Sequence, residues 1–110
     1  MSTSESPVYI VYITCANPEE ATRIGRSLVN ARLAACVNIL GEIRSIYRWN
    51  DQLADEPEVL CLAKTTADRL EALRERVIEL HHYEVPEVIA VPVAAGHLPY
   101  LAWVRENTAD

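Results

Sequence analysis

The chain has 110 residues, a formal net charge of −6 and 50% apolar residues. This length suits one domain, and the acidic balance disfavours nucleic acid as a partner, because a phosphate backbone attracts basic surfaces. No apolar run approaches the roughly 20 residues that a membrane-spanning helix requires. The three cysteines lack a Cys-x-x-Cys spacing, which argues against a disulfide framework or a zinc ribbon and favours a reducing compartment.

The N-terminal segment is small and polar, with neither a basic start nor an apolar signal core. We therefore expect a disordered tail over residues 1–6 and a single domain over residues 7–110. The same features predict a cytoplasmic protein that is not exported and has no membrane partner.

The chain begins its ordered part with a strand and a helix. Residues 8–14 are rich in β-branched and aromatic side chains, which predicts a strand. Asn17, Pro18 and Glu20 then supply a capping side chain, a proline for the first helical position and a capping-box acid. The apolar spacing that follows predicts a helix that ends near residues 32–33.

A long strand and a shorter one follow. Residues 35–49 predict the second strand, in which Gly41 indicates a bulge or a bend. The polar residues 50–55 predict a turn, and residues 58–65 predict the third strand. Thr65, three residues before an aspartate, predicts a cap for the next helix.

The last part of the chain predicts a helix, a strand and a final helix. Leucine and valine recur at helical spacing over residues 70–80. Residues 88–94 predict the fourth strand, and Pro92 within it indicates a sheet edge or a bulge. Pro99 can open a short closing helix. This order predicts an α+β, ferredoxin-like βαββαβ fold with an extra C-terminal helix.

Two features predict an oligomer. In this fold helices cover one sheet face, yet the first strand is apolar on both faces, so its open face requires a cover. A strand over residues 35–49 would span roughly 50 Å, whereas the radius of gyration of a globule of this length is about 13 Å. The alternative is that Gly41 breaks the strand and that tyrosine hydroxyls on the open face reach solvent.

The densest polar cluster is His81-His82-Tyr83-Glu84-Val85-Pro86-Glu87, in a connection between a helix and a strand. Imidazole and carboxylate bind divalent metals, and a soft ligand such as Cys15 would favour copper. The alternative is that a histidine at a helix C-terminus only bonds the last carbonyl groups. An enzyme is disfavoured, because a Cys15–His81 pair lacks a third partner and no glycine-rich loop is present.

Three further residues are candidates for binding a ligand or for an interface. Lys64 is the only lysine, and it can bind an anion, pair with Glu58 or Glu87, or extend to solvent from a strand end. Trp49 and Trp103 lie near polar segments, where large aromatic side chains serve as interface core or as a ligand platform.

Five stretches of the chain, in order, resemble the CutA family of divalent-cation tolerance proteins. They are Ala31-Arg32-Leu33-Ala34-Ala35-Cys36-Val37-Asn38, Ser45-Ile46-Tyr47-Arg48-Trp49, Lys64-Thr65-Thr66, His81-x-Tyr83-Glu84-x-Pro86-Glu87 and Tyr100-Leu101-x-Trp103. The resemblance spans about residues 8–105. It implies a ferredoxin-like homotrimer similar in architecture to PII signalling proteins, with divalent-cation tolerance, copper binding, no enzymatic activity and no organic cofactor.

The resemblance also implies site residues. Cys15 matches the strand-end cysteine of copper-binding members, His81 matches the motif histidine and Glu84 its following acid. His82 stands where the family usually has proline and adds a further possible ligand. The residues that resemble the lining of the intersubunit cleft are Trp49, Glu58, Lys64, Tyr83, Glu87 and Trp103.

Two hypotheses for function follow from these observations. The first is a trimer that binds a divalent metal, with copper(II) favoured. The second is a PII-like trimer that binds a small molecule or a protein partner in its intersubunit clefts. The spacing of the residues does not decide whether Cys15 and His81 share one site.

Overall fold

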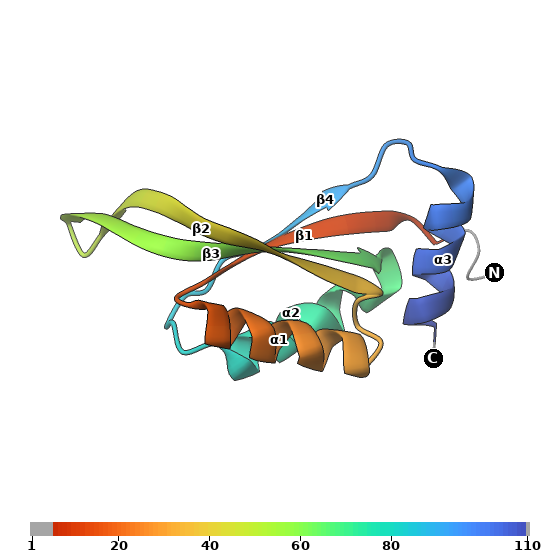
Figure 1. The fold of residues 1–110 in the computed structure, drawn as a ribbon, viewed down its shortest axis with the longest axis horizontal. Helices are drawn as coiled ribbons and strands as arrows, with labels where there is room; N and C mark the ends of the chain where they lie inside the picture. The colour runs from red at the N-terminus through yellow and green to blue at the C-terminus, as the bar shows by residue number, and fades with distance from the viewer. Residues whose placement is uncertain (1–5, 110) are drawn as a thin grey trace.

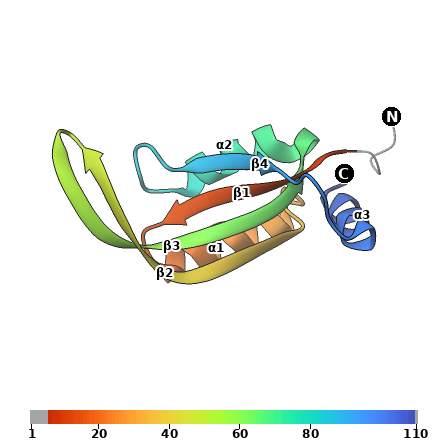
Figure 2. The same ribbon diagram turned by 90° about the horizontal axis from the view of Figure 1, so that it is seen from above.

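The computed structural model describes residues 6–109, and it is an α+β fold in two layers. A four-stranded antiparallel sheet has the strand order β2-β3-β1-β4, and α1 and α2 pack on one of its faces (Figures 1 and 2). The elements are β1 (Val8–Cys15), α1 (Pro18–Asn30), β2 (Cys36–Trp49), β3 (Gln52–Thr66), a 3₁₀ turn (Ala67–Arg69), α2 (Leu70–Leu80), β4 (Val88–Pro92) and α3 (Leu98–Thr108). The predicted βαββαβ order with an extra helix is confirmed. The predicted tail lies, apart from Ser6, outside the described residues.

The start of α1 follows the predicted signal. The Asn17 side chain accepts a hydrogen bond from the backbone N–H of Glu20 at 2.8 Å, and Pro18 is the first helical residue. The helix ends two residues earlier than predicted, because Arg32 adopts a left-handed φ of 59° and the N–H of Leu33 bonds back to the carbonyl of Leu28.

The main core lies between the sheet and the two covering helices. Alternate residues of β1, Val11 and Ile13, are fully buried there against Ile24 and Leu28 of α1 and Leu73 of α2. A smaller cluster joins α3 to the sheet end. The alternate apolar residues of β1 and the apolar stripe of α1 thus form one apolar layer.

The β2–β3 hairpin extends beyond the rest of the sheet (Figure 1). Pairing of β1 with β3 ends at Cys15 and Val59, so Gln52–Glu58 pair only with β2. The molecule is therefore elongated, with extents of 47 × 25 × 23 Å. The strand predicted over residues 35–49 does not break at Gly41, because the chain passes that point with a register shift between Ile39 and Glu42.

Three local predictions were wrong. Residues 50–55 are not a turn, because Asn50 and Asp51 alone reverse the chain and β3 begins at Gln52. Pro57 is tolerated there, since β1 does not reach this part of β3 and the strand is an edge on that side. Thr65 does not cap the next helix, because its hydroxyl donates to the carbonyl of Leu33 at 2.7 Å. The fourth strand ends at Pro92 and not at residue 94 as predicted, although it does lie on the sheet edge that the proline indicated.

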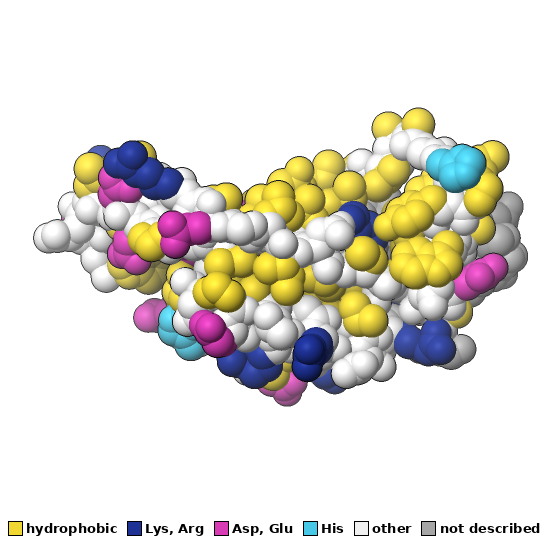
Figure 3. All heavy atoms as spheres, in the orientation of Figure 1, with side chains coloured by type: hydrophobic (Ala, Val, Ile, Leu, Met, Phe, Trp, Pro, Cys, Tyr) yellow, Lys and Arg dark blue, Asp and Glu magenta, His cyan; other side chains and the backbone are white. Residues whose placement is uncertain are grey.

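The sheet face away from α1 and α2 is apolar, as predicted. Register aligns Leu62, Tyr12 and Ile89 across β3, β1 and β4 on this open face, and Tyr12 and Ile89 are exposed. Apolar side chains gather along the corresponding upper edge of the molecule (Figure 3). Such a contiguous apolar surface is unusual for a chain that functions alone.

The hairpin turn yields a test of backbone strain. Asn50 and Asp51 have φ of 51° and 62°, the left-handed pair of a two-residue hairpin turn. We expect Asp51→Gly to stabilise the fold by roughly 0.5–1 kcal/mol, because glycine adopts this backbone without the cost to a side-chain-bearing residue. Denaturant unfolding at fixed protein concentration measures the change. The matched control is Gln52→Gly, which should destabilise; equal losses for both variants would contradict the strain argument.

Candidate functional site

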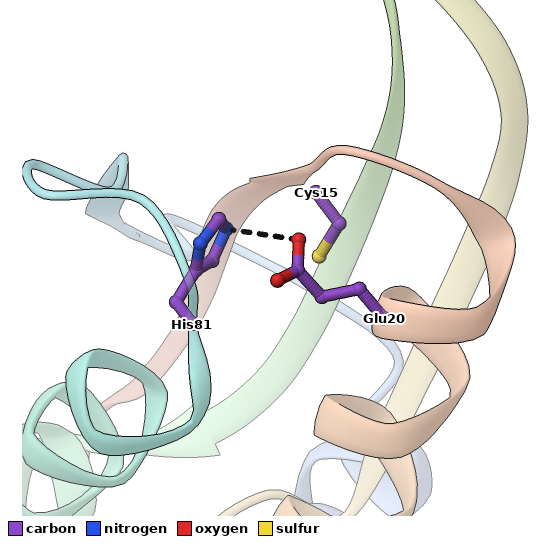
Figure 4. A group of neighbouring side chains, drawn as sticks. All are labelled: Cys15, Glu20 and His81. Atoms are coloured by element: carbon purple, nitrogen blue, oxygen red, sulfur yellow. Dashed lines mark ion pairs between the residues drawn. The ribbon is translucent and has the colours of Figure 1, made fainter.

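The strongest cluster of metal-ligating side chains joins the end of β1 to the start of α1 and the end of α2. The ligand atoms of Cys15, Glu20 and His81 all lie within 4.8 Å of one another, and all three residues are buried (Figure 4). The fold therefore brings together Cys15 and His81, which are far apart in sequence. Glu20, expected only as a helix cap, completes this cluster.

Glu20 is a buried carboxylate with several donors. Its Oε1 accepts from the N–H of Ala16 at 3.0 Å, and its Oε2 accepts from the N–H of His82 at 3.2 Å and from His82 Nδ1 at 2.6 Å. Burial alone would raise the pKa of Glu20, but these hydrogen bonds and the nearby His81 hold the pKa below its ordinary value of 4.5. Glu20 therefore ties the start of α1 to the connection after α2.

His81 is held in one tautomer. The N–H of Tyr83 donates to His81 Nδ1 at 3.1 Å, so the ring proton resides on Nε2. Nε2 then donates to the carbonyl of Thr14 at 2.7 Å and lies 3.7 Å from Oε1 of Glu20. Both ring nitrogens are thus engaged within the protein, and a metal would have to displace the proton on Nε2.

The surroundings of Cys15 favour the protonated form of its thiol. A hydrogen bond with Cys61 on the neighbouring strand, burial and the nearby carboxylates of Glu20 and Glu58 raise the pKa of Cys15 well above its ordinary range. The donor types of the cluster, namely thiol, carboxylate and imidazole, fit a borderline or soft divalent metal. Binding would release the proton of the Cys15 thiol and would require the tautomer of His81 with its proton on Nδ1.

The other two predicted metal ligands occupy different places. His82 contacts the cluster through Glu20, and its side chain is 60% exposed. Glu84 is exposed and lines a separate pocket. Among the described residues, neither belongs to the group of converging ligand atoms.

That pocket lies between the β2–β3 hairpin and the connection before β4, and its volume is about 570 Å³. Tyr83 donates its hydroxyl to Oε2 of Glu58 at 2.8 Å and so links the two walls. Desolvation, together with this hydrogen bond to a carboxylate, raises the pKa of Tyr83. Four of the six predicted cleft residues line this pocket: Trp49, Glu58, Tyr83 and Glu87. Tyr47 and Glu84 line it as well.

The remaining two predicted cleft residues lie outside this pocket. Lys64 contacts the side-chain oxygen of Asn38 on β2, and it pairs with neither Glu58 nor Glu87, because register places it opposite Cys36. Trp103 stacks on Tyr100 within α3, with ring centroids 5.6 Å apart.

Comparison with known proteins is consistent with this geometry. The family model described as "CutA1 divalent ion tolerance protein" matches residues 9–107. The chain belongs to the CutA1 family. A relative from Thermus thermophilus, "Divalent-cation tolerance protein CutA", is 48% identical over 90% of this chain and 96% of its own length. The human "Protein CutA" is 46% identical over 92% of this chain, which spans 56% of that relative.

Solved structures of CutA1 proteins have the same fold. The structure titled "Divalent cation tolerance protein (Cut A1)" from Thermus thermophilus matches with a TM-score of 0.90 and 47% identity, over 93% of this chain and 99% of the other. CutA1 from Oryza sativa matches with a TM-score of 0.93 and 40% identity, over 97% and 98%. The family name refers to tolerance of divalent cations. Within residues 6–109, no helix is long and apolar enough to cross a membrane.

The Glu20 network generates a prediction about acid stability. We expect Glu20→Gln to lower the free energy of unfolding at neutral pH by roughly 1–3 kcal/mol, because the amide is a poorer acceptor for its buried donors. The depressed pKa makes this contribution complete above about pH 4.5, and it is lost as pH falls through the lower folded-state pKa. Denaturant unfolding between pH 7 and pH 3 measures both effects.

Glu19→Gln is the matched control, because Glu19 is exposed in the same helical turn. The acid-dependent loss of stability should be smaller in Glu20→Gln than in the wild type and in Glu19→Gln. Identical pH profiles for all three proteins would contradict the role given to Glu20.

Proposed function

We propose that this chain binds a divalent cation, copper(II) foremost, as part of divalent-cation tolerance and without catalysing a reaction. The observation that supports this proposal is the convergence of three buried ligand atoms from Cys15, Glu20 and His81 within 4.8 Å. Thiolate and imidazole together favour copper over hard cations such as magnesium. The names of the CutA1 relatives, which refer to divalent-cation tolerance, agree with a metal.

The proposed ligands keep two of the four expected residues and add one that was not expected. Cys15 and His81 remain, Glu20 supplies the carboxylate, and Glu84 and His82 become the alternatives that mutation must test. The metal would replace the proton of the Cys15 thiol, so its affinity should rise with pH, and the Nε2 proton of His81 would move to Nδ1 of the same ring. Three free cysteines suit the reducing cytoplasm, which is the location we propose.

The proposed working form is a homotrimer. Its support is the apolar open face around Tyr12 and Ile89, together with a hairpin that extends beyond its own sheet. A neighbouring chain would bury both features, which a chain alone leaves in water. Closed symmetric assembly removes exposed apolar surface from every copy in the same way.

A second candidate function is favoured by the pocket between the hairpin and the connection before β4. In this alternative, the trimer resembles PII proteins and binds a small molecule or a protein partner in its intersubunit clefts. The pocket volume of about 570 Å³ suits a small organic ligand.

Copper binding is tested by calorimetric titration of Cu(II) buffered with glycine, without oxygen. We expect Cys15→Ser, Glu20→Gln and His81→Gln each to weaken binding by at least about tenfold, since each removes one ligand. Between pH 6 and pH 8, wild-type affinity should rise by up to about tenfold per pH unit for each proton released.

Glu84→Gln is the matched control. Glu84 lies in the same connection as His81, but its carboxylate is outside the cluster. Unchanged affinity in Glu84→Gln with losses in the other three variants supports the proposed ligands. If Cys15→Ser, Glu20→Gln and His81→Gln all retain wild-type affinity and stoichiometry, this metal site is wrong.

The trimer is tested by light scattering after size exclusion, where the wild type should give about three times the chain mass. We expect Tyr12→Glu to dissociate the assembly, because it places an unpaired charge in an apolar interface. Ile78→Glu should stay trimeric, since Ile78 is also apolar and exposed but lies on α2, on the other side of the molecule. A monodisperse wild-type monomer at micromolar concentration would rule the trimer out.

A further inference from the structure

The pocket beside the hairpin carries a strong imbalance of charge. Three carboxylates line it, from Glu58, Glu84 and Glu87, and its lining residues, all within the described chain, include no lysine, arginine or histidine. A pocket of this composition repels anions and attracts cations.

Glu58 differs from an ordinary surface acid because its side chain is buried. It is only 8% exposed, yet its hydrogen-bond partner is the neutral hydroxyl of Tyr83, and no basic side chain of residues 6–109 lies within ion-pair distance of it. A buried carboxylate is normally compensated by a cation, because removing its charge from water is costly. Burial, and then the nearby charge of Glu58, raise the pKa of Glu87 on the same pocket lining.

A bare metal ion does not match this pocket. Among the described residues, the one group of three ligand atoms that converges within 4.8 Å is that of Cys15, Glu20 and His81. The carboxylates of Glu58, Glu84 and Glu87 do not converge in that way. The volume of about 570 Å³ is also that of an organic ligand and far exceeds that of an ion.

Aromatic rings provide the rest of the lining. Tyr47 and Trp49 lie on one face of β2, and Tyr83 stands on the opposite wall, fixed by its hydrogen bond to Glu58. Rings of this kind attract an alkylated ammonium group through their negative faces, and they pack against its carbon atoms. The carboxylate of Glu58 and the aromatic rings thus both favour a cationic ligand.

We propose that this pocket binds an organic cation, an ammonium group carrying alkyl substituents, between the aromatic rings and the carboxylate of Glu58. This inference rests on the second candidate function, since it names the ligand class of the same pocket. Its ligand would contact other side chains than those of the metal cluster. Glu84 and Glu87, at the exposed rim, would draw the cation in by long-range attraction.

Choline is the probe, and the full chain is used with EDTA present so that metal binding does not contribute. Its neutral isostere, in which a quaternary carbon replaces the nitrogen, and the corresponding carboxylate of similar shape are titrated in parallel. Calorimetry and backbone amide chemical shifts follow binding. We expect choline to bind about tenfold more tightly than the neutral isostere, with shifts at Tyr47, Trp49 and Tyr83, and the anion not to bind.

Two variants locate the binding. Glu58→Gln keeps the shape of the side chain and its acceptor for Tyr83 but removes the charge, so choline affinity should fall by at least about fivefold while the neutral isostere is unaffected. Trp49→Leu should weaken choline by a similar factor. Glu75→Gln, which removes an exposed carboxylate from α2, is the matched control and should leave choline binding unchanged.

Each outcome bears on one claim. Equal or tighter binding of the neutral or anionic probe would contradict the proposal that the ligand is an organic cation. It would still support a pocket for small molecules. No binding of any probe overturns both the cation and the small-molecule pocket, and copper binding is judged by its own titration. If Glu58→Gln changes the oligomeric state, or if it and Glu75→Gln weaken choline equally, the role given to Glu58 is wrong.

Discussion

The arrangement of this molecule depends on one buried carboxylate. Glu20 accepts hydrogen bonds from Ala16, just after β1, and from His82, after α2, and it does so from the first turn of α1. Burying this charge is tolerable only because several donors surround it at once. These bonds fix the three chain segments at one end of the sheet, and the positions of Cys15 and His81 follow from them.

From that point a chain of hydrogen bonds runs to the pocket. His81 accepts from the backbone of Tyr83, and Tyr83 donates its hydroxyl to Glu58 on β3. The cluster of metal-ligating groups and the acidic pocket therefore share one connecting segment, residues 81–83. A change that moves His81 would also move Tyr83, and so the two proposed binding events have a physical route by which one can influence the other.

The sequence predicted the fold more completely than the site. Periodicity along β1 and α1 depends on local chemistry, so the elements and the apolar open face could be predicted. The hairpin was predicted too short, because polar residues and Pro57 usually indicate a turn. Here they lie in a strand, since β1 ends beside Val59 and leaves that part of β3 exposed on one side. Glu20 was recognised as a helix cap, but its closeness to Cys15 and His81 arises from tertiary packing. Lys64 similarly contacts Asn38, a neighbour that only strand register defines.

The overhang of the hairpin has a consequence for local unfolding. Arg44 and Asp55 join its two strands by a pair of hydrogen bonds at 2.7 and 2.6 Å, but both side chains are exposed and β1 does not reach this part of β3. Within one chain, the end of the hairpin can therefore open without disturbing Ile13 or Leu73 in the core. Its backbone amides should exchange with solvent through a small local opening, while those of β1 exchange only when the whole sheet unfolds.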